Sequence, residues 1–244
     1  MRMIKIAALL LSAALVLPDQ GIIAARRKLP IFSVETPEQV VALTFNAAYA
    51  SADTEVILDI LRDNGIKASF FLCGIWIGRN PGLLERMKAE GHDIGNHGDT
   101  HAHVASMSLS AVAGEISGTH QKIKTQLGIE MNLFRPPYGE YNDVVVEAAE
   151  ALGYYTIQWD VDSHDWMNKG EEAEVWRVLE HKKLRNGSII LFHTDAKHTA
   201  AALPRIIEGL KDMGYGFVPV SKLIYTEDYE IDHEGRQVPK RGAL

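Results

Sequence analysis

The sequence contains one cysteine, no run of about 20 apolar residues that would form a standard membrane span, and no excess of basic residues. Cys73 cannot form an internal disulfide, and the apolar run around it predicts a buried thiol rather than a nucleophile. The formal net charge of −7 argues against a surface that gathers nucleic acid through clustered basic side chains. The 244 residues, 46% of them hydrophobic and 23% charged, can bury the core of one α/β domain.

The first apolar stretch, Ile6 to Leu17, follows a basic N-terminal end and is too short for a standard span. Ser12 is its only polar residue, which leaves no polar face for a buried amphipathic helix. Ala24-Ala25 fits a cleavage point, while Arg26-Arg27-Lys28 fits the charged flank of an uncleaved anchor equally well. We therefore predict that residues 1–27 are a signal peptide or membrane anchor. The protein is then exported and is extracellular, in the cell wall or membrane-anchored.

From residue 40 onward, short β-branched or aromatic runs alternate with longer helical patterns, which is typical of repeated βα units and a parallel sheet. Strands are predicted at 40–45, 68–72, 132–134, 154–158, 188–192 and 216–220, and helices at 54–63, 81–88, 108–127, 144–151, 171–184 and 200–213. About seven or eight units predict an α/β fold, a (β/α) barrel that is distorted or incompletely closed. An open doubly wound sheet is the alternative, although no Gly-x-Gly-x-x-Gly turn follows the first strand. The predicted organisation is a linker at 28–39, a domain at 40–225 and a C-terminal extension at 226–244.

Polar residues follow several of these strands, at the end where a parallel barrel assembles its active site. The densest group is Gly95-Asn96-His97-Gly98-Asp99-Thr100-His101-Ala102-His103. Imidazoles four residues apart can face one side of a helical turn and bind a borderline-soft cation such as Zn²⁺. Such a pair alone is weak evidence for a metal site, because solvated loop histidines occur at the same spacing.

Further motifs follow in order along the chain: Phe134-Arg135-Pro136-Pro137-Tyr138-Gly139, Trp159 to Trp166 with the sequence WDVDSHDW, and Ser188 to His193. With Leu43-Thr44-Phe45 and the histidine cluster, their order resembles the polysaccharide deacetylases, the NodB homology domain of carbohydrate esterase type. The flanks, 26–31 and 229–233, resemble an exported Gram-positive branch of that family. The resemblance covers roughly 40–225 and implies a metal-dependent hydrolase that removes acetyl groups from an N-acetylated glycan.

The resemblance also implies roles for individual residues. A metal polarises the acetamide carbonyl and activates water, a carboxylate takes the proton, and an imidazolium protonates the leaving amine. The metal-binding histidines correspond to His97 and His101. His193 corresponds to the general acid, Asp165 to the carboxylate that pairs with it, and Arg135 to the arginine that holds the base. The remaining correspondences are the backbone N–H of Tyr138 as oxyanion donor, and Trp166 and Leu191 as the walls of the acetyl pocket.

The first motif departs from the family pattern Thr-Phe-Asp-Asp, because this sequence has Thr44-Phe45-Asn46-Ala47. Asn46 stands at the position of the catalytic base but cannot accept a proton near neutral pH, and the methyl group of Ala47 cannot bind a metal. Loss of a general base costs about 10²–10⁴-fold in rate when nothing replaces it.

A replacement metal ligand or carboxylate is therefore needed for activity. Asp53 is our first candidate, although it also fits an N-terminal helix cap. Asp99 is the next, and Asp162 and His103 are weaker candidates.

Two functions remain open. In the first, the protein is a divalent-metal-dependent deacetylase, with Zn²⁺ as the expected ion and peptidoglycan or a chitin-like glycan as substrate. In the second, it is a degenerate member that binds the glycan on Tyr49, Tyr138 and Trp166 without hydrolysing it. The altered first motif favours the second function, and the retained set of His193, Asp165 and Arg135 favours the first.

Overall fold

The computed structural model describes residues 27–240. The predicted signal peptide or anchor, residues 1–27, therefore lies outside the described residues except for its last one. Within residues 27–240, no helix combines the length and the apolar character needed to cross a membrane.

The main sheet is a curled, parallel half-barrel that is built around β2 (Val40–Ala47). Its strands lie in the order β6–β5–β4–β3–β2–β8–β7, and the short strand β9 pairs with the beginning of β2. Every pairing in this sheet is parallel. The other strands are β3 (Ser69–Leu72), β4 (Asp93–Asn96), β5 (Leu133–Phe134), β6 (Tyr155–Thr156), β7 (Val161–Asp162), β8 (Ile189–His193) and β9 (Gly216–Phe217). The predicted fold, a distorted and incompletely closed α/β barrel, is confirmed.

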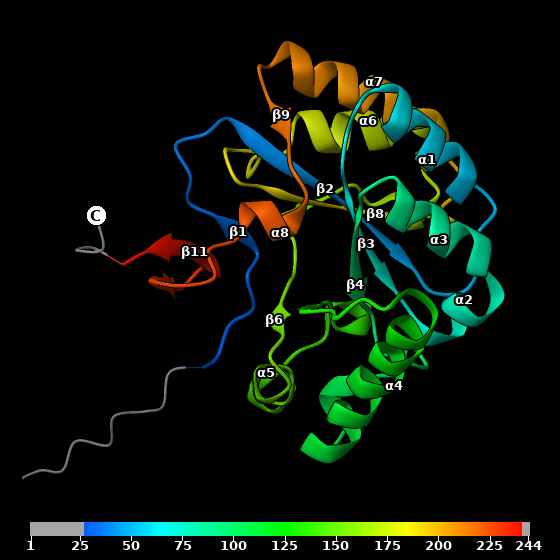
Figure 1. The fold of residues 1–244 in the computed structure, drawn as a ribbon. Coiled ribbons are helices and arrows are strands. Elements are labelled where there is room, and N and C mark those ends of the chain that lie inside the picture. The colour runs from blue at the N-terminus through cyan, green and yellow to red at the C-terminus, as the bar shows by residue number, and fades with distance from the viewer. Residues whose placement is uncertain (1–26, 241–244) are drawn as a thin grey trace, which may run out of the picture.

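Helices cover the outer side of the curled sheet (Figure 1). They are α1 (Thr54–Asp63), α2 (Gly74–Arg79), α3 (Pro81–Ala89), α4 (Leu109–Leu127), α5 (Asp143–Ala151), α6 (Glu171–Leu179) and α7 (Thr199–Asp212). The short α8 (Val220–Leu223) packs instead on the apolar cluster that contains Ala42 of β2, on the inner side of the sheet. Three 3₁₀ turns lie in the connections: η1 (Val104–Ser106), η2 (Pro137–Gly139) and η3 (Asp165–Met167). Local sequence explains the ends of α4: the hydroxyl of Ser108 accepts from the Ala111 N–H, and Gly128 adopts a left-handed conformation.

The alternation along β2 decides which side chains reach the inside of the barrel. Val41, Leu43 and Phe45 belong to the apolar cluster that also contains the inner faces of the helices. Each fully buried side chain of this kind stabilises the fold by about 1.5–3 kcal/mol. Residues of the other parity face the interior, where Thr44 and Asn46 both contact the Arg135 side chain. The pleat therefore directs Asn46 inward and leaves Ala47 in the helix-packed cluster.

A second, small sheet joins the two flanks of the barrel. β1 (Ser33–Val34) lies in the segment predicted as a linker, and it pairs with β11 (Arg236–Pro239) of the predicted C-terminal extension. β10 (Tyr229–Ile231) completes this sheet in antiparallel pairing with β11. The small sheet lies apart from α1 to α3, at the left of Figure 1. It contacts the amino end of β8 through a bridge between Ser33 and Ser188, so it lies at the opposite end of that strand from His193.

Some elements differ from the sequence-based prediction. β4 and α2 were not predicted, and α6 ends at Leu179 rather than at Leu184. The turn after α6 has a local cause, since the His181 ring accepts from the Lys183 N–H and competes with helical hydrogen bonding.

Candidate active site

A cavity of about 490 Å³ opens where the carboxyl ends of β2, β7 and β8 meet the loops after β4 and β5. Such clefts at the carboxyl ends of parallel strands are the usual active sites of α/β barrels. The lining residues are Asn46, Ala48, Tyr49, His97, His101, Tyr138, Gly139, Trp159, Asp162, Trp166, Leu191, His193 and Asp195.

A partly exposed histidine at the cavity wall, His193, pairs with the fully buried carboxylate of Asp165. The Nδ1 atom of His193 lies 2.8 Å from Oδ1 of Asp165, and the backbone N–H of His193 donates to Oδ2 at 2.6 Å. The Thr199 hydroxyl and the Trp166 N–H also donate to the Asp165 carboxylate. Burial lowers the pKa of His193, but the hydrogen bond and charge of Asp165 outweigh it and raise the pKa above the usual 6.5. His193 can therefore hold a proton over the cavity, as a general acid must.

His97 and His101 lie together at the cavity wall, with ring centroids 5.0 Å apart. They do not lie on a helical turn as the spacing suggested, because the segment is a loop in which Gly98 and His101 both have positive φ. Burial, with the charge of His101, holds the pKa of His97 well below 6.5, so His97 is neutral. Its Nδ1 donates to the carbonyl of Arg135 at 2.7 Å, which leaves Nε2 as an acceptor.

Arg135 is completely buried inside the barrel, where it contacts the cavity residue Asn46. Its Nη1 atom donates to Thr44 Oγ1 at 2.9 Å and to Asn46 Oδ1 at 3.1 Å. Its Nη2 atom donates to the carbonyl of Gln158, and its Nε has no hydrogen-bond partner among the described residues. Burial lowers the pKa of Arg135 to about 9, an effect that the charge of Asp162 only partly offsets. The guanidinium is thus held by neutral oxygens.

Asn46 and Ala47 define what the site can do at the end of β2. The oxygen of the Asn46 amide faces Arg135, which leaves its NH₂ group, a pure donor, on the other side of the amide. Ala47 is fully buried and is not among the residues that line the cavity. The position that faces Arg135 therefore offers no group that can accept a proton near neutral pH.

Aromatic side chains form part of the cavity wall. The hydroxyl groups of Tyr49 and Tyr138 lie 3.5 Å apart, and this contact together with burial raises the pKa of Tyr49 to about 12. Tyr138 has a left-handed backbone, with φ of 59°, and its ring stacks on His103 at a centroid distance of 4.2 Å. Trp166 is 56% exposed at the cavity, whereas Leu191 is buried in it. The cavity thus combines a polar floor with aromatic walls, as glycan sites require.

The candidate replacement residues lie in different surroundings. Asp53 occupies the N-cap position of α1 without a capping hydrogen bond from its side chain, and it does not line the cavity. Asp99 faces α4, where it pairs with Lys122 at 2.5 Å. His103 pairs with Glu140 at 2.9 Å. Only Asp162 lines the cavity, and its carboxylate accepts from the Trp159 indole and the His164 N–H.

The metal-binding side chains that the described part of the cavity groups together are fewer than a catalytic metal ion needs. Catalytic zinc is usually held by three protein ligands. Between residues 27 and 240, no group of three or more His, Cys, Asp or Glu side chains is arranged to hold a metal. His97 and His101 supply two imidazoles, and Ala47 supplies none. These residues do not fit a catalytic zinc ion.

Two cavity residues with polar or aromatic side chains, Asp195 and Trp159, received no role from the sequence. Asp195 follows β8 by two residues, and its negative charge raises the pKa of His193. Trp159 lines the cavity and places its ring 5.5 Å from the Arg135 guanidinium. The rule that polar residues after a strand end meet at one edge could have indicated Asp195.

The parallel half-barrel carries a histidine–aspartate pair and two clustered imidazoles at the carboxyl ends of its strands. These features define a protein of the α/β-barrel class with a cavity of the hydrolase type. Comparison with known proteins gives the family. Residues 33–157 match the polysaccharide deacetylase family, and the chain belongs to it.

The sequence is 36% identical over 198 residues to a peptidoglycan-N-acetylglucosamine deacetylase of Bacillus cereus, covering 79% of this chain and 92% of that protein. It is also 36% identical to the peptidoglycan-N-acetylglucosamine deacetylase PgdA of Listeria monocytogenes, over 84% of this chain but only 44% of that longer protein.

Solved structures add a second kind of relative. A CE4-family pseudoenzyme of Bacillus anthracis superimposes with a TM-score of 0.75 at 30% identity, over 80% of this chain and 68% of that chain. A mutant of that pseudoenzyme with restored enzymatic activity gives the same TM-score and identity, over 80% of this chain and 70% of that chain. The relatives therefore include both peptidoglycan deacetylases and a protein without the activity.

Proposed function

We propose that this protein binds an N-acetylated cell-wall glycan, of the peptidoglycan or chitin type, without hydrolysing its amide bonds. The contact between Arg135 and Asn46 carries this proposal. The resemblance to the family implies a catalytic base at position 46 and a metal-binding carboxylate at position 47. An amide and a methyl group stand there instead, so neither proton abstraction nor a third metal ligand is available at these positions.

The binding surface supports the same function. Tyr49, Tyr138 and Trp166 all line the cavity, and Trp166 exposes 56% of its surface. Aromatic faces bind sugar rings through their apolar side while polar groups orient the hydroxyls. The names of the relatives in Bacillus and Listeria support peptidoglycan as the glycan and hence a location outside the cytoplasm, at the cell wall or the membrane surface.

The experiment measures binding and acetate release on the same sample. Isothermal titration of the protein with an N-acetylglucosamine tetramer should give saturable binding, weakened about tenfold or more by Trp166→Ala, in the range of a lost aromatic anchor. Leu152→Ala, an exposed change on the C-terminal end of α5, is the matched control. No acetate should appear in the same mixture. Absence of binding would refute the proposal.

A second candidate is the deacetylase itself, favoured by the 2.8 Å contact between His193 and Asp165 and by the raised pKa of His193. In that case a carboxylate of the cavity, Asp162 or Asp195, would replace the missing base. Sustained acetate release that disappears in His193→Ala and in Asp162→Asn or Asp195→Asn would establish this candidate.

A further inference from the structure

The charged side chains that line the cavity of about 490 Å³ include two carboxylates, Asp162 and Asp195. Among the described residues that line it, none is a lysine or an arginine, since Arg135 is fully buried and is not part of the lining. Asp195 is exposed, and the Asp162 side chain is 22% exposed. The Asp162 carboxylate accepts from the Trp159 indole and the His164 N–H, which leaves part of its roughly four lone-pair sites for a ligand.

The histidine beside these carboxylates does not neutralise them. When His193 is protonated, it pairs with Asp165 at 2.8 Å, so this pair carries no net charge. Burial lowers the pKa of His193 and Asp165 raises it, and the charges of Asp195 and Asp162 raise it further. Both carboxylates therefore act on the same part of the cavity wall and make it electronegative.

An uncharged acceptor, which is almost fully buried, belongs to the same wall. His97 is 1% exposed, and it lines the cavity. Within residues 27–240 its ring hydrogen-bonds through Nδ1 to the Arg135 carbonyl, so Nε2 is left for whatever enters the cavity. A buried acceptor without a donor is unfavourable, and a ligand that supplies an N–H group removes that cost.

The chemistry of these acceptors selects one form of an amino sugar. An ammonium group carries three N–H donors, no acceptor and one positive charge, whereas an acetamide carries one N–H donor, one carbonyl acceptor and no charge. Hydrogen bonds between charged groups are about twice as strong as those between neutral groups. Two carboxylates and an imidazole nitrogen therefore suit the ammonium group better. The neutral donors of the cavity, the Asn46 amide and the tyrosine hydroxyls, suit sugar hydroxyls instead.

We propose that the cavity takes the ammonium group of an N-deacetylated hexosamine, in a glycan whose other sugars are N-acetylated, with Asp162, Asp195 and His97 as its acceptors. This inference rests on the proposed function, because the same cavity and its aromatic walls hold the glycan chain. It adds that the preferred ligand is a glycan already partly deacetylated. The reaction that supplies such a ligand is the hydrolysis of an acetamide, which is the reaction that the names of the relatives describe.

The test titrates the full chain calorimetrically with two tetramers at about pH 6, where the free amine of a sugar is protonated. One is the fully acetylated N-acetylglucosamine tetramer, and the other has one internal sugar N-deacetylated. The tetramer with the free amine should bind about tenfold more tightly, the difference expected between charged and neutral hydrogen bonds. Asp162→Asn and Asp195→Asn should each reduce this preference several-fold, and together they should remove it.

A matched control separates the cavity from the negative charge of the whole protein. Asp212→Asn makes the same chemical change at the exposed last residue of α7. The next residue, Met213, accepts from the Gln39 side chain just before β2, so this position lies at the opposite end of the barrel from the cavity. The preference should be unchanged in this variant. Thermal unfolding of each variant shows whether it is folded.

The outcomes separate this inference from the function on which it rests. Equal affinity for the two tetramers refutes the ammonium site while the proposed function stands. A preference that Asp212→Asn reduces as much as Asp162→Asn and Asp195→Asn do also refutes the site, because the attraction is then to the overall charge. If only the tetramer with the free amine binds, the function as proposed for a fully acetylated glycan fails and the ammonium site stands. If neither tetramer binds, both are refuted.

Discussion

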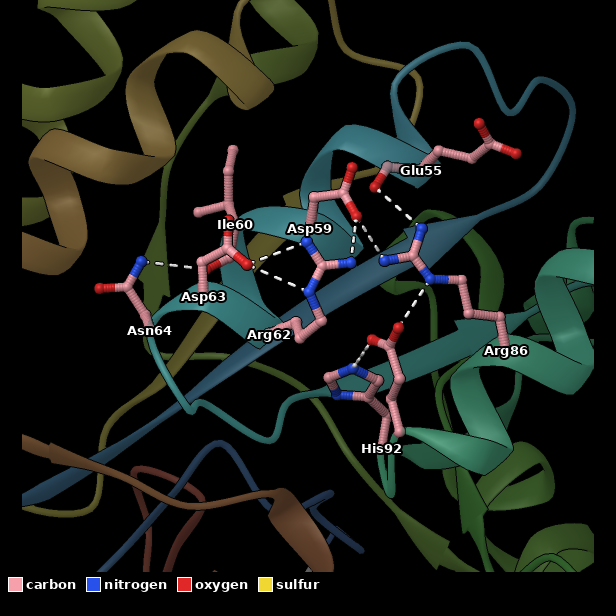
Figure 2. Close-up of polar contacts among 9 residues, drawn as sticks. Glu55, Asp59, Ile60, Arg62, Asp63, Asn64, Arg86 and His92 are labelled. Atoms are coloured by element: carbon pink, nitrogen blue, oxygen red, sulfur yellow. Dashed lines mark hydrogen bonds and ion pairs between the residues drawn. The ribbon is translucent and has the colours of Figure 1, made fainter.

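Two arginines of this protein stand in opposite electrostatic surroundings. Arg86, on α3, donates from Nη2 to Asp59 at 2.7 Å (Figure 2). Its Nε donates to Glu90, also at 2.7 Å. The hydrogen bond to Glu90, with that to Asp59, outweighs burial and raises the pKa of Arg86. Arg135 is fully buried, yet its acceptors are the neutral oxygens of Thr44, Asn46 and Gln158, and burial lowers its pKa to about 9.

The two arginines differ in the charge of the groups that accept their hydrogen bonds. A charge near the surface gains little from an ion pair, because water and salt already screen it. A fully buried charge depends far more on its partner. This protein supplies two carboxylates to the partly exposed cation and neutral acceptors to the buried one. We interpret Asn46 as the residue that leaves the Arg135 charge unbalanced and that removes the base.

The largest effect is expected when both altered positions are changed together. Asn46→Asp supplies a base beside Arg135. Ala47 is the last residue of β2 and stands between the cavity residues Asn46 and Ala48, so the longer side chain of Ala47→Asp can turn toward the cavity as a third metal ligand. Acetate release from the N-acetylglucosamine tetramer in the presence of zinc, which we expect to be absent in the unmodified protein, should become measurable, because a general base usually contributes about 10²–10⁴-fold in rate. Adding His193→Ala to this variant should abolish the gain. A double variant that binds zinc but releases no acetate would show that other parts of the site have also been lost.

Glu174 is a second buried ionisable side chain for the comparison. Its pKa in the folded protein is raised from the usual 4.5 to about 7, so the folded state holds the proton more tightly than the unfolded state between these values. Stability should therefore fall as pH rises through this range, and Glu174→Gln, which cannot ionise, should avoid the loss. We expect the variant to gain about 1–3 kcal/mol over the original protein between pH 5 and pH 8.

Urea unfolding at both pH values measures this difference, with Glu180→Gln, the same chemical change at an exposed position at the end of α6, as control. Parallel pH dependence in the two proteins would show that Glu174 is not buried as a charged group.

Asn46→Asp alone should stabilise the protein by about 1–2 kcal/mol near pH 8, because a carboxylate replaces a neutral acceptor for the buried Arg135 guanidinium. The guanidinium should depress the pKa of the introduced carboxylate. The gain is then present above the unfolded pKa of about 4 and is lost as pH falls through the lower folded value. Chemical denaturation at a series of pH values from 8 to 3 measures this gain in the free energy of unfolding. Destabilisation at pH 8 would mean that the cost of burying the carboxylate exceeds its attraction to Arg135.

The smallest effect is expected at the surface cluster of Figure 2. Asp59→Asn removes a carboxylate that accepts from both Arg86 and Arg62. Because this carboxylate is exposed to solvent, we expect only a slight decrease in the unfolding midpoint, and one that disappears in 1 M salt as the Debye length shrinks to about 3 Å. If Asp59→Asn lowered stability by more than Asn46→Asp raises it, the partly exposed Arg86 would depend more on its charged partner than the buried Arg135 does, contrary to this comparison.

The repeated βα pattern was sufficient to predict the barrel and most of its helices, because periodicity reports which face of each element is buried. β4 was not predicted because its polar residues, Asp93 and Asn96, interrupt the apolar pattern typical of a buried strand. Gly95 within it is required by packing, since a Cβ there would lie 2.7 Å from the Phe71 ring. The motifs after strand ends placed His97, His101 and His193 at one cavity, as the parallel arrangement requires.

Directions of side chains in loops could not be predicted in the same way. Asp99 and His103 stand within six residues of His97, but Lys122 of α4 and Glu140 after η2 decide where they point. These partners come from distant parts of the chain, so no local sequence pattern indicates them. The same holds for Glu174, which shows the spacing of an ordinary helix position and is buried only because α6 packs on the neighbouring loop and on α7.

Zinc affinity, measured by titration calorimetry on the metal-free protein, tests the central claim most directly. We predict no tight zinc binding by the unmodified protein, because no third ligand accompanies His97 and His101 among residues 27–240. We predict one tight equivalent for the variant with Asn46→Asp and Ala47→Asp. About one tight equivalent in the unmodified protein, lost in His97→Ala, would contradict the account. Asp53→Ala would then show whether Asp53 is the recruited ligand.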